Sequence, residues 1–254
     1  EFMVMVSDVA KAEIPQAFVG YTRGRQLGHG ASGLVFACAR DGSGEAFAVK
    51  VIDLRRLRLS AKADREFKKL QREVDILKRV PAHPNLVRFV DAVEEGHFFM
   101  MIMECVEGGD LFSALMRRGS GPQRPRFSMT EAAFVLRQLV DGLGFLHKQG
   151  VIHRDLKLEN VLVTHERQEG PHRLCSVKIT DFGLSKVVGE GLSDARSTVG
   201  SPRYIAPEVL SNGVHDFRAD LWSLGILLYV LLAGRFPADG LPEVQQSILD
   251  AAIL

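Results

Sequence analysis

An eight-residue stretch, HRDLKLEN (153–160), carries five ionisable side chains and an asparagine directly before the apolar run VLV. A compact loop anchored by that run would present Asp155, Lys157 and Asn160 on one side. A carboxylate at Asp155 can orient a hydroxyl group and accept its proton. A second carboxylate, Asp181, follows an alternating strand pattern, and with Asn160 it offers the oxygen ligands that Mg²⁺ bound to a nucleotide prefers. Each residue alone is compatible with an ordinary turn, but their joint presence in this order favours catalysis.

A glycine-rich stretch, GHGASGLV, places Gly28, Gly30 and Gly33 between two strand-like segments. Because glycine has no Cβ, backbone N–H groups there can approach phosphate oxygens closely. Dinucleotide-binding turns share this spacing but require a helix after the third glycine, whereas residues 34–39 alternate as a strand does. Taken alone, the stretch is equally compatible with an ordinary glycine-rich hairpin.

Lys50 ends the apolar segment FAVK, where its aliphatic stem would be partly buried. A buried ammonium group needs a partner, and the next helical segment offers Glu73. Most helical glutamates are solvated, but Glu73 lies beside Val74 and Leu77 on the apolar stripe, which favours pairing with Lys50. Lys69 precedes Glu73 by one turn on the same helix face.

The elements that position these residues change character along the chain. Strand-like segments come first, at 21–28, 33–40, 45–52 and 86–106, interrupted by one helical segment at 61–80. Ser128 and Glu131 form a capping-box pattern before a helix that we expect to end near residue 147. The polar stretch 164–176 reads as a surface loop between short strands, and 181–208 as irregular. This order predicts an α+β fold, with a small β-rich lobe followed by an α-rich lobe.

The composition excludes several classes of protein. With 46% hydrophobic and 25% charged residues among 254, the chain is typical of globular proteins. Its 32 Lys and Arg nearly cancel 31 Asp and Glu, so net charge gives no reason to expect a nucleic acid or membrane partner. The three widely spaced cysteines predict no disulfides and an intracellular location, cytoplasmic, nuclear or both.

Two segments bear on targeting. The most apolar run, 221–234, is shorter than the roughly 20 residues that span a bilayer, so we predict a buried helix there. The first 20 residues lack the basic start of a signal peptide. Because the chain begins with Glu1 rather than Met, we expect it to be part of a longer gene product.

In combination, the motifs resemble those of the eukaryotic protein kinase family, serine/threonine type. The matching segments are GHGASGLV, FAVK, the helical Glu73, HRDLKLEN, DFG and APE (206–208). The resemblance covers residues 21–254 and implies a bilobal protein-kinase-like fold. Residues 1–20 would be an N-terminal extension, 21–106 the nucleotide-binding N-terminal lobe, and 107–254 the catalytic C-terminal lobe, truncated before its last helices. The segments VKITDFGLSK, GSPRYIAPEVL and DLWSLGILLYVLLAG are most similar to the calcium/calmodulin-dependent kinase group and its checkpoint-kinase relatives.

The resemblance implies ATP and Mg²⁺ as cofactors and assigns a role to each site residue. Lys50, paired with Glu73, would hold the α- and β-phosphates, while Asn160 and Asp181 bind Mg²⁺. Asp155 would be the catalytic base or orienting residue, and Lys157 would stabilise the transferring phosphoryl group. Met103 would be the gatekeeper, with the backbone of Glu104 and Val106 meeting adenine and Asp110 near the ribose. The full set of implied nucleotide contacts is Leu27, Gly28, Gly30, Gly33, Val35, Ala48, Lys50, Met103, Glu104, Val106, Asp110 and Leu162.

Regulation follows from the same resemblance. Arg154, Lys186 and Lys69 occupy the positions that gather around a phosphorylated activation segment in related kinases. Ser197 would carry the phosphate, and Thr198 is the alternative acceptor; both could instead be solvated loop hydroxyls. An upstream activating kinase is then an expected partner.

Substrate choice is the second implied property. Asp110 and Glu159 fall where basophilic relatives hold an arginine three residues before the target, and two carboxylates suit a guanidinium group. Together with Ser201 and the positioning segment around it, they predict a protein substrate with a basic residue upstream of Ser or Thr.

Two departures and two alternatives accompany the resemblance. Leu158 stands where proline is commonest, and Glu208 would lack the arginine that usually pairs with it, which would be costly for a buried carboxylate. The runner-up function is a kinase-like scaffold or regulatory pseudokinase that binds nucleotide without efficient transfer; the intact catalytic residues argue against it. A small-molecule kinase is disfavoured by the peptide-positioning segment GSPRYIAPE.

Overall fold

The computed structural model describes residues 14–30, 33–55, 63–119, 124–181, 186–187, 201–212 and 216–237. The chain divides into two compact units, Glu1–Val74 with Arg88–Cys105, and Asp75–Val87 with Val106–Leu254. The dividing line passes through the helix α3 (Ala63–Arg79), so the end of that helix and the following loop belong with the second unit.

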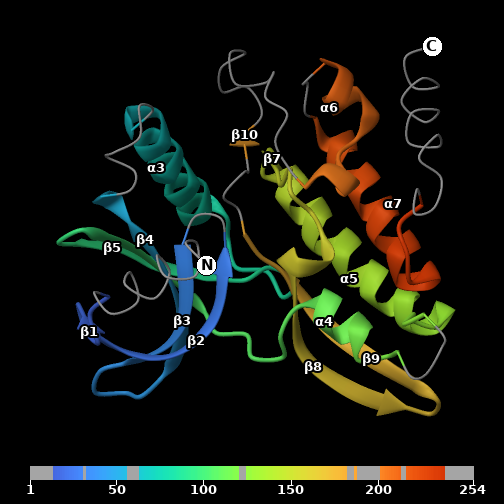
Figure 1. The fold of residues 1–254 in the computed structure, drawn as a ribbon, viewed down its shortest axis with the longest axis horizontal. Helices are drawn as coiled ribbons and strands as arrows, with labels where there is room; N and C mark the ends of the chain where they lie inside the picture. The colour runs from blue at the N-terminus through green and yellow to red at the C-terminus, as the bar shows by residue number, and fades with distance from the viewer. Residues whose placement is uncertain are drawn as a thin grey trace, which may run out of the picture. The chain divides into compact units, whose positions relative to one another are not determined.

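The first unit is built on an antiparallel sheet of six strands in the order β1-β2-β3-β4-β6-β5 (Figure 1). Its strands are β1 (Ala17–Phe18), β2 (Tyr21–Gly30), β3 (Gly33–Arg40), β4 (Ala46–Asp53), β5 (Phe89–Glu95) and β6 (Phe98–Glu104). The strands expected from the alternating segments are confirmed. Most of their ends lie within one or two residues of the expected positions. The short strand β1 lies in the range expected to be an extension, and Phe18 belongs to the buried core.

The two faces of this sheet have different occupants. Phe47, Val49 and Val51 of β4 pack in a core cluster with apolar residues of β3 and β6 on one face. Lys50 lies between them in sequence and therefore points to the opposite face. There it meets Glu73 of α3, so that helix covers the Lys50 face. Strand β4 is accordingly buried on both faces for most of its length.

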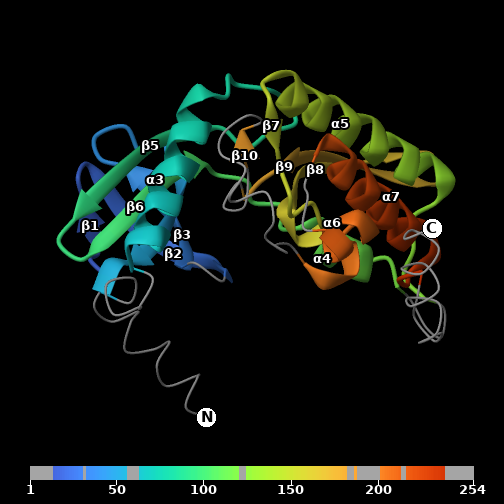
Figure 2. The ribbon, with the colours of Figure 1, turned by 90° about the horizontal axis from the view of Figure 1, so that it is seen from above.

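Among the described residues, the second unit contains most of the helices, two two-stranded sheets (β7 with β10 and β8 with β9) and the 3₁₀ turns η1 and η3. Its elements are α4 (Leu111–Met116), α5 (Met129–Lys148), β7 (Val151–Ile152), η1 (Leu158–Asn160), β8 (Val161–Glu169), β9 (His172–Ile179), β10 (Lys186–Val187), η3 (Pro202–Tyr204), α6 (Pro207–Asn212) and α7 (Phe217–Ala233). The helices α5 and α7 lie side by side in both views (Figures 1 and 2), and the hairpin of β8 and β9 packs on α5. The predicted α+β class is confirmed.

The two long helices of this unit begin as their sequences suggest. The side chain of Ser128 accepts a hydrogen bond from the backbone N–H of Glu131, whose carboxylate accepts one from the N–H of Ser128, so the predicted capping box is confirmed. The apolar run expected to be a buried helix forms α7, capped by Asp216 and ended by Gly234 in the left-handed conformation. Among the described helices, none has the length and apolarity to cross a membrane.

The expected surface loop at 164–176 is wrong: strands β8 and β9 pair through it, leaving a turn at 170–171. Polar contacts from α5 and from Arg118, which follows α4, hold the paired strands. The side-chain oxygen of Gln138 accepts a hydrogen bond from the N–H of Val177 at 2.9 Å, and Glu131 Oε1 accepts one from the N–H of Arg173. The guanidinium of Arg118 donates to the carbonyl of Arg173 at 2.7 Å. These partners lie about 40 residues or more away in sequence.

All three cysteines fall in described segments, and no disulfide joins any two of them. Burial, with a smaller contribution from Cys105, raises the pKa of the Cys38 thiol to about 11. Cys38 is therefore protonated at neutral pH.

Candidate active site

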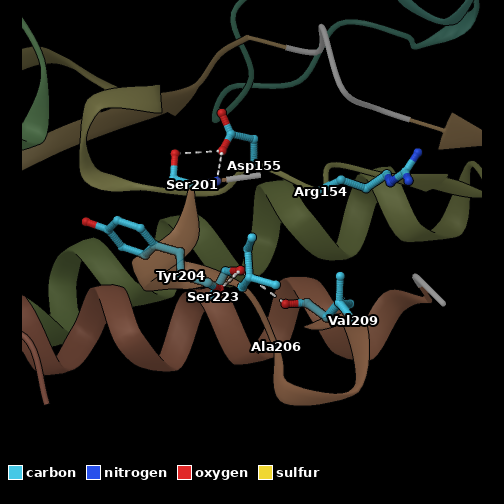
Figure 3. Close-up of a pocket in the computed structure, with 9 residues that line it drawn as sticks. Arg154, Asp155, Ser201, Tyr204, Ala206, Val209 and Ser223 are labelled. Atoms are coloured by element: carbon cyan, nitrogen blue, oxygen red, sulfur yellow. Dashed lines mark hydrogen bonds between the residues drawn. The ribbon is translucent and has the colours of Figure 1, made fainter. Parts of the chain in front are cut away.

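The carboxylate of Asp155 is the centre of a dense hydrogen-bond cluster within the second unit. Its Oδ2 accepts from Lys157 Nζ at 2.8 Å and from Asn160 Nδ2 at 3.1 Å. Its Oδ1 accepts from the backbone N–H of Ser201 at 2.9 Å and from the Ser201 hydroxyl at 3.0 Å, as Figure 3 shows. Lys157 Nζ also donates to Ser201 Oγ at 2.9 Å. The structure thus brings together four residues that the sequence analysis proposed for catalysis, metal binding and substrate contact.

Asp155 lies in the loop 153–160, called the catalytic loop below. A residue of α7 anchors the backbone of this loop. The carboxylate of Asp220, which is 1% exposed, accepts hydrogen bonds from the backbone N–H groups of His153 and Arg154 at 2.9 and 2.8 Å. Arg154 has a φ of 72°, a left-handed conformation rare outside glycine, and the two bonds hold it there. His147 Nε2 lies 2.8 Å from Asp220 Oδ2.

Asp220 and His147 were missed by the sequence analysis. A lone carboxylate in the otherwise apolar LWSLGILLYVLL region was the available signal, because a buried charge needs partners.

The same loop is tied to the strand that leads to Asp181. The buried ring of His153 contacts the carbonyl of Thr180 through Nε2 at 3.0 Å, and the N–H of Thr180 donates to the carbonyl of Asn160 at 2.9 Å. Asp181 follows with a φ of 64°, again in the left-handed region. Strained positions of this kind cluster at functional sites. Asn160 and Asp181 are therefore held on two segments that share hydrogen bonds.

The amide of Asn160 and the carboxylate of Asp181 have the kind of oxygen donor that a hard divalent cation prefers. The Asn160 amide nitrogen donates to Asp155, which leaves its carbonyl oxygen as the atom suited to a metal. No group of three or more His, Cys, Asp or Glu side chains in the described segments could hold an ion by itself. Two protein oxygens are what a Mg²⁺ carried by nucleotide phosphates uses.

In the first unit, Lys50 Nζ lies 3.7 Å from Glu73 Oε1, and both side chains are 9% exposed. In the sheet, Val35 of β3 lies opposite Lys50, and Met103 of β6 lies opposite Ala48. Because alternate residues share a face, these candidate nucleotide contacts lie on the same face as Lys50.

The backbone at Glu104, which would meet adenine, is partly engaged. The N–H of Glu104 donates to the carbonyl of Arg88, the residue before β5, at 2.9 Å. Leu27 lies where β2 departs from regular pairing with β3, between Gln26 and Gly28. Val106 and Leu162 belong to the second unit and are both half-buried.

The glycines of the glycine-rich stretch differ in whether the surrounding structure would accept a side chain. A Cβ at Gly33 would collide with the carbonyl oxygen of Val51 in β4, so a side chain would push the strands apart. A Cβ at Gly28 would meet nothing within 4 Å, and Gly30 pairs with Gly33 across the hairpin. Packing thus explains glycine at 33, while among the described residues no neighbour would contact a Cβ at 28.

The two carboxylates expected to meet substrate arginine have unequal surroundings. Asp110 caps α4, accepting from the N–H of Ser113 at 2.7 Å and from its hydroxyl at 2.9 Å. Glu159, in contrast, is exposed. Burial and then the charge of Glu159 raise the pKa of the Tyr204 phenol, which places Glu159 near that ring. Glu159 is the more available acceptor.

A small pocket lies beneath the catalytic loop, between that loop, the 201–206 segment, α6 and α7 (Figure 3). Its lining residues are Arg154, Asp155, Ser201, Tyr204, Ile205, Ala206, Val209, Ala219 and Ser223. The hydroxyl of Ser223 donates to the carbonyl of Tyr204 at 2.8 Å and so fixes the 201–206 segment to α7.

The structure describes only some of the residues expected to regulate the chain. Ser197 and Thr198 lie outside the described residues. Lys186 stands on β10 opposite Ile152 of β7, and Lys69 lies in α3.

The structure describes both positions, Leu158 and Glu208, at which the sequence departs from the usual kinase pattern. Leu158 is fully buried, which suits leucine at that position. The concern that Glu208 would be a buried carboxylate is wrong: it is exposed in the first turn of α6.

The sequence profile of the family described as Protein kinase domain matches residues 21–253. This chain belongs to the protein kinase family. CBL-interacting serine/threonine-protein kinase 17 of Arabidopsis thaliana is 40% identical to it over 225 residues, which cover 86% of the chain and 47% of that relative. Calcium-dependent protein kinase 8 of the same plant is 36% identical over 235 residues, covering 92% of the chain and 40% of the relative.

Myosin light chain kinase A of Dictyostelium discoideum is 35% identical over 229 residues, covering 89% of the chain and 71% of the relative. The matches confirm the resemblance to serine/threonine kinases and are consistent with the calcium/calmodulin-dependent kinase group. This kinase chain spans less than half the length of the two plant relatives.

Proposed function

We propose that this chain transfers the γ-phosphoryl group of Mg-ATP to serine and threonine hydroxyls of protein substrates. The observation that carries the proposal is the Ser201 hydroxyl, which donates to Asp155 Oδ1 at 3.0 Å. A substrate hydroxyl that took the same place would be oriented by Asp155, which would accept its proton. Lys157, already 2.8 Å from Asp155, would lie beside the transferring group and reduce its negative charge.

The remaining site residues would hold the nucleotide. Members of this family use ATP with a divalent metal ion. Lys50, oriented by Glu73, would pair with the phosphates, and the glycines 28, 30 and 33 would cover them with backbone N–H groups. Asn160 and Asp181 would hold Mg²⁺, which when bound neutralises charge on the β- and γ-phosphates. The side-chain face shared by Val35, Ala48 and Met103 is suited to the adenine ring.

We infer a preference for arginine three residues before the target. Glu159 is exposed close to Tyr204, and Asp110 retains acceptor capacity because a carboxylate has about four lone-pair sites and Ser113 uses two. Exchanging that substrate arginine for alanine should lower kcat/KM about tenfold or more. Equal rates for the two peptides would contradict this preference.

We also propose activation by phosphorylation of Ser197, or of Thr198 as the alternative acceptor, by an upstream kinase. Arg154, Lys186 and Lys69 would bind the phosphate, since clustered cations are relieved by such an anion. The proposal predicts that the double alanine variant at 197 and 198 loses most activity. Full activity in that variant would refute the proposal.

The first experiment is transfer of labelled phosphate from Mg-ATP to a serine peptide with arginine at the third position before the target. Asp155→Ala is the control variant. Transfer that the control abolishes supports the proposed function. If neither protein transfers phosphate after an upstream kinase has phosphorylated Ser197 or Thr198, although ATP raises the melting temperature of both, the chain acts as a nucleotide-binding scaffold and the proposed function is wrong.

A further inference from the structure

A short turn presents Ser201 to the catalytic loop. Pro202–Tyr204 form the 3₁₀ turn η3, and the N–H of Tyr204 donates to the carbonyl of Ser201 at 2.8 Å. Ser201 in turn donates to Asp155 Oδ1 through both its N–H and its hydroxyl. Ser201 and Tyr204 are therefore the two hydrogen-bonded ends of one turn, so a shift of Tyr204 would move Ser201 relative to Asp155.

The Tyr204 end of this turn is held from α7. The hydroxyl of Ser223 donates to the Tyr204 carbonyl at 2.8 Å, and both residues are buried (Figure 3). In the described part of the chain no second donor reaches this carbonyl. The Ser223 hydroxyl also lies 3.2 Å from the carbonyl of Ala219, but that carbonyl is inside a helix and accepts from the N–H four residues later. Loss of the hydroxyl would therefore leave the Tyr204 carbonyl without a donor.

Hydrogen bonds link α7 to the catalytic loop in one unbroken series. Ser223 donates to Tyr204, Tyr204 donates to Ser201, and Ser201 donates to Asp155. All four residues line the small pocket between the loop, the turn and α7 (Figure 3). A hollow on this side leaves fewer atoms in contact, so packing alone holds the turn less firmly there. The bonded series therefore contributes to the position of the turn, and its members strengthen one another.

A substrate hydroxyl at Asp155 would replace the hydroxyl of Ser201 but not its backbone N–H. That N–H donates to the same oxygen, Asp155 Oδ1, at 2.9 Å. The turn must therefore keep its place while the Ser201 side chain gives way, and the bond from Ser223 holds the other end of the turn. Lys50 and Glu73, which would serve the nucleotide, are not members of this series.

We propose that Ser223 is a positioning residue for the protein substrate. Its hydroxyl holds the turn that meets the substrate hydroxyl beside Asp155, so it acts through Tyr204 and Ser201 rather than by contact with the substrate. Its loss should impair use of the peptide and spare use of ATP. This inference rests on the proposed function and adds to it a residue on α7.

The test is Ser223→Ala, which removes the hydroxyl and adds no bulk. We expect kcat/KM for the serine peptide with its upstream arginine to fall about tenfold, because a buried carbonyl loses its donor. The KM for ATP should stay within about twofold of wild type, because the change acts on the peptide side of the site. Steady-state kinetics with each substrate varied in turn measure both, on protein whose activation segment an upstream kinase has phosphorylated.

The chain offers a matched control in Ser128→Ala. This variant also removes a serine hydroxyl in the same unit, where it accepts from the N–H of Glu131 at the start of α5. Loss of such a cap should lower the melting temperature by about 2–4 °C and leave both kinetic parameters within about twofold of wild type. The melting temperature of Ser223→Ala, measured beside it, shows whether that variant is folded.

The outcomes separate this proposal from the proposed function. A Ser223→Ala variant that keeps the wild-type kcat/KM for the peptide overturns the role of Ser223 and leaves the proposed function intact. Equal losses for the peptide and for ATP, or equal losses in Ser223→Ala and Ser128→Ala, do the same, because they indicate a general loss of stability. Absence of transfer by the phosphorylated wild-type chain overturns both.

Discussion

The two clusters of candidate catalytic residues differ in how tightly their side chains are held. Around Asp155, four hydrogen bonds measure between 2.8 and 3.1 Å, and the loop backbone is anchored again by Asp220. Lys50 and Glu73 lie 3.7 Å apart, beyond the roughly 2.7–2.9 Å of a charge-assisted hydrogen bond. The hydrogen bonds around Asp155 are already formed, whereas the Lys50–Glu73 distance exceeds that of a charge-assisted hydrogen bond.

The difference indicates which of the two groups of residues is more easily displaced in this kinase. Asp155 is positioned by residues of its own unit, so its geometry depends on the packing of the catalytic loop against α7. The Lys50–Glu73 pair joins a strand to a helix through two flexible side chains. Because Glu73 lies on α3, a displacement of this helix would change the distance between Lys50 and Glu73.

The largest effect should follow from Asp155→Asn. The amide keeps the shape of the side chain but loses the charge that attracts Lys157 and the capacity to accept a proton. We expect kcat to fall by about a thousandfold while the dissociation constant for ATP stays within a few-fold. Steady-state kinetics and ATP titration by calorimetry measure the two. A kcat within tenfold of wild type would show that Asp155 does not accept the proton.

Asp220→Asn tests the backbone anchor. An amide has one acceptor oxygen, so it cannot serve the N–H groups of His153 and Arg154 as the carboxylate does. A buried group that loses its acceptor costs about 1–3 kcal/mol, and we expect that loss in urea unfolding, with kcat reduced more than ATP affinity. Asp141→Asn, the same change at a side chain that is 66% exposed and 3.6 Å from His83 Nε2, is the control; it should lower the free energy of unfolding by less than about 1 kcal/mol and leave kcat unaltered.

Glu73→Gln tests the looser cluster. Lys50 then lacks its carboxylate partner, and kcat/KM for ATP should fall about ten- to a hundredfold, less than the change at Asp155. Asp75→Asn makes the same chemical change at an exposed site of α3 and should leave the kinetics unaltered. If Glu73→Gln lowered activity more than Asp155→Asn, the comparison between the clusters would be reversed.

The smallest effect should come from Glu131, away from both clusters. Burial acts to raise the pKa of this carboxyl, but hydrogen bonds from Ser128 and Arg173 and the charge of Arg118 outweigh it, so the pKa lies below its usual value of 4.5. Glu131→Gln should lower the free energy of unfolding by about 1–2 kcal/mol at pH 7.

The sign of the pH dependence follows from the lowered pKa. The ionised carboxylate stabilises the fold above its usual value of 4.5, and this contribution is lost as the pH falls through the folded-state pKa. The difference between wild type and Glu131→Gln should therefore be constant near neutral pH and shrink below 4.5. Urea unfolding at a series of pH values measures it, and a difference that grew on acidification would contradict the lowered pKa.

Local signals in the sequence predicted much of this fold. The alternating strands, the helix carrying Glu73 and the capping box at Ser128 depend on neighbours within a few residues, and all were confirmed. The hairpin through 164–176 was missed because its support comes from Arg118, Glu131 and Gln138, whose contacts no local pattern reveals.

The candidate site divides in the same way. Motif spacing identified Asp155, Lys157 and Asn160, and their hydrogen bonds bring them together. The anchor Asp220 escaped notice because a carboxylate in the first turn of a helix is ordinary, and its value depends on backbone groups over 60 residues earlier in the chain. The helix-capping role of Asp110 was likewise hidden behind its resemblance to a substrate contact.

The hairpin of β8 and β9 has a practical consequence for engineering. Strand β9 is held to α5 from Arg173 to Val177, while the turn at the tip contains Gly170, which has a φ of 57° and free space around it. Lengthening a surface loop costs only about 0.6 kcal/mol for each doubling of its length. An epitope tag or fluorescent reporter inserted between residues 170 and 171 should therefore be tolerated, giving a labelled kinase domain with its termini unaltered.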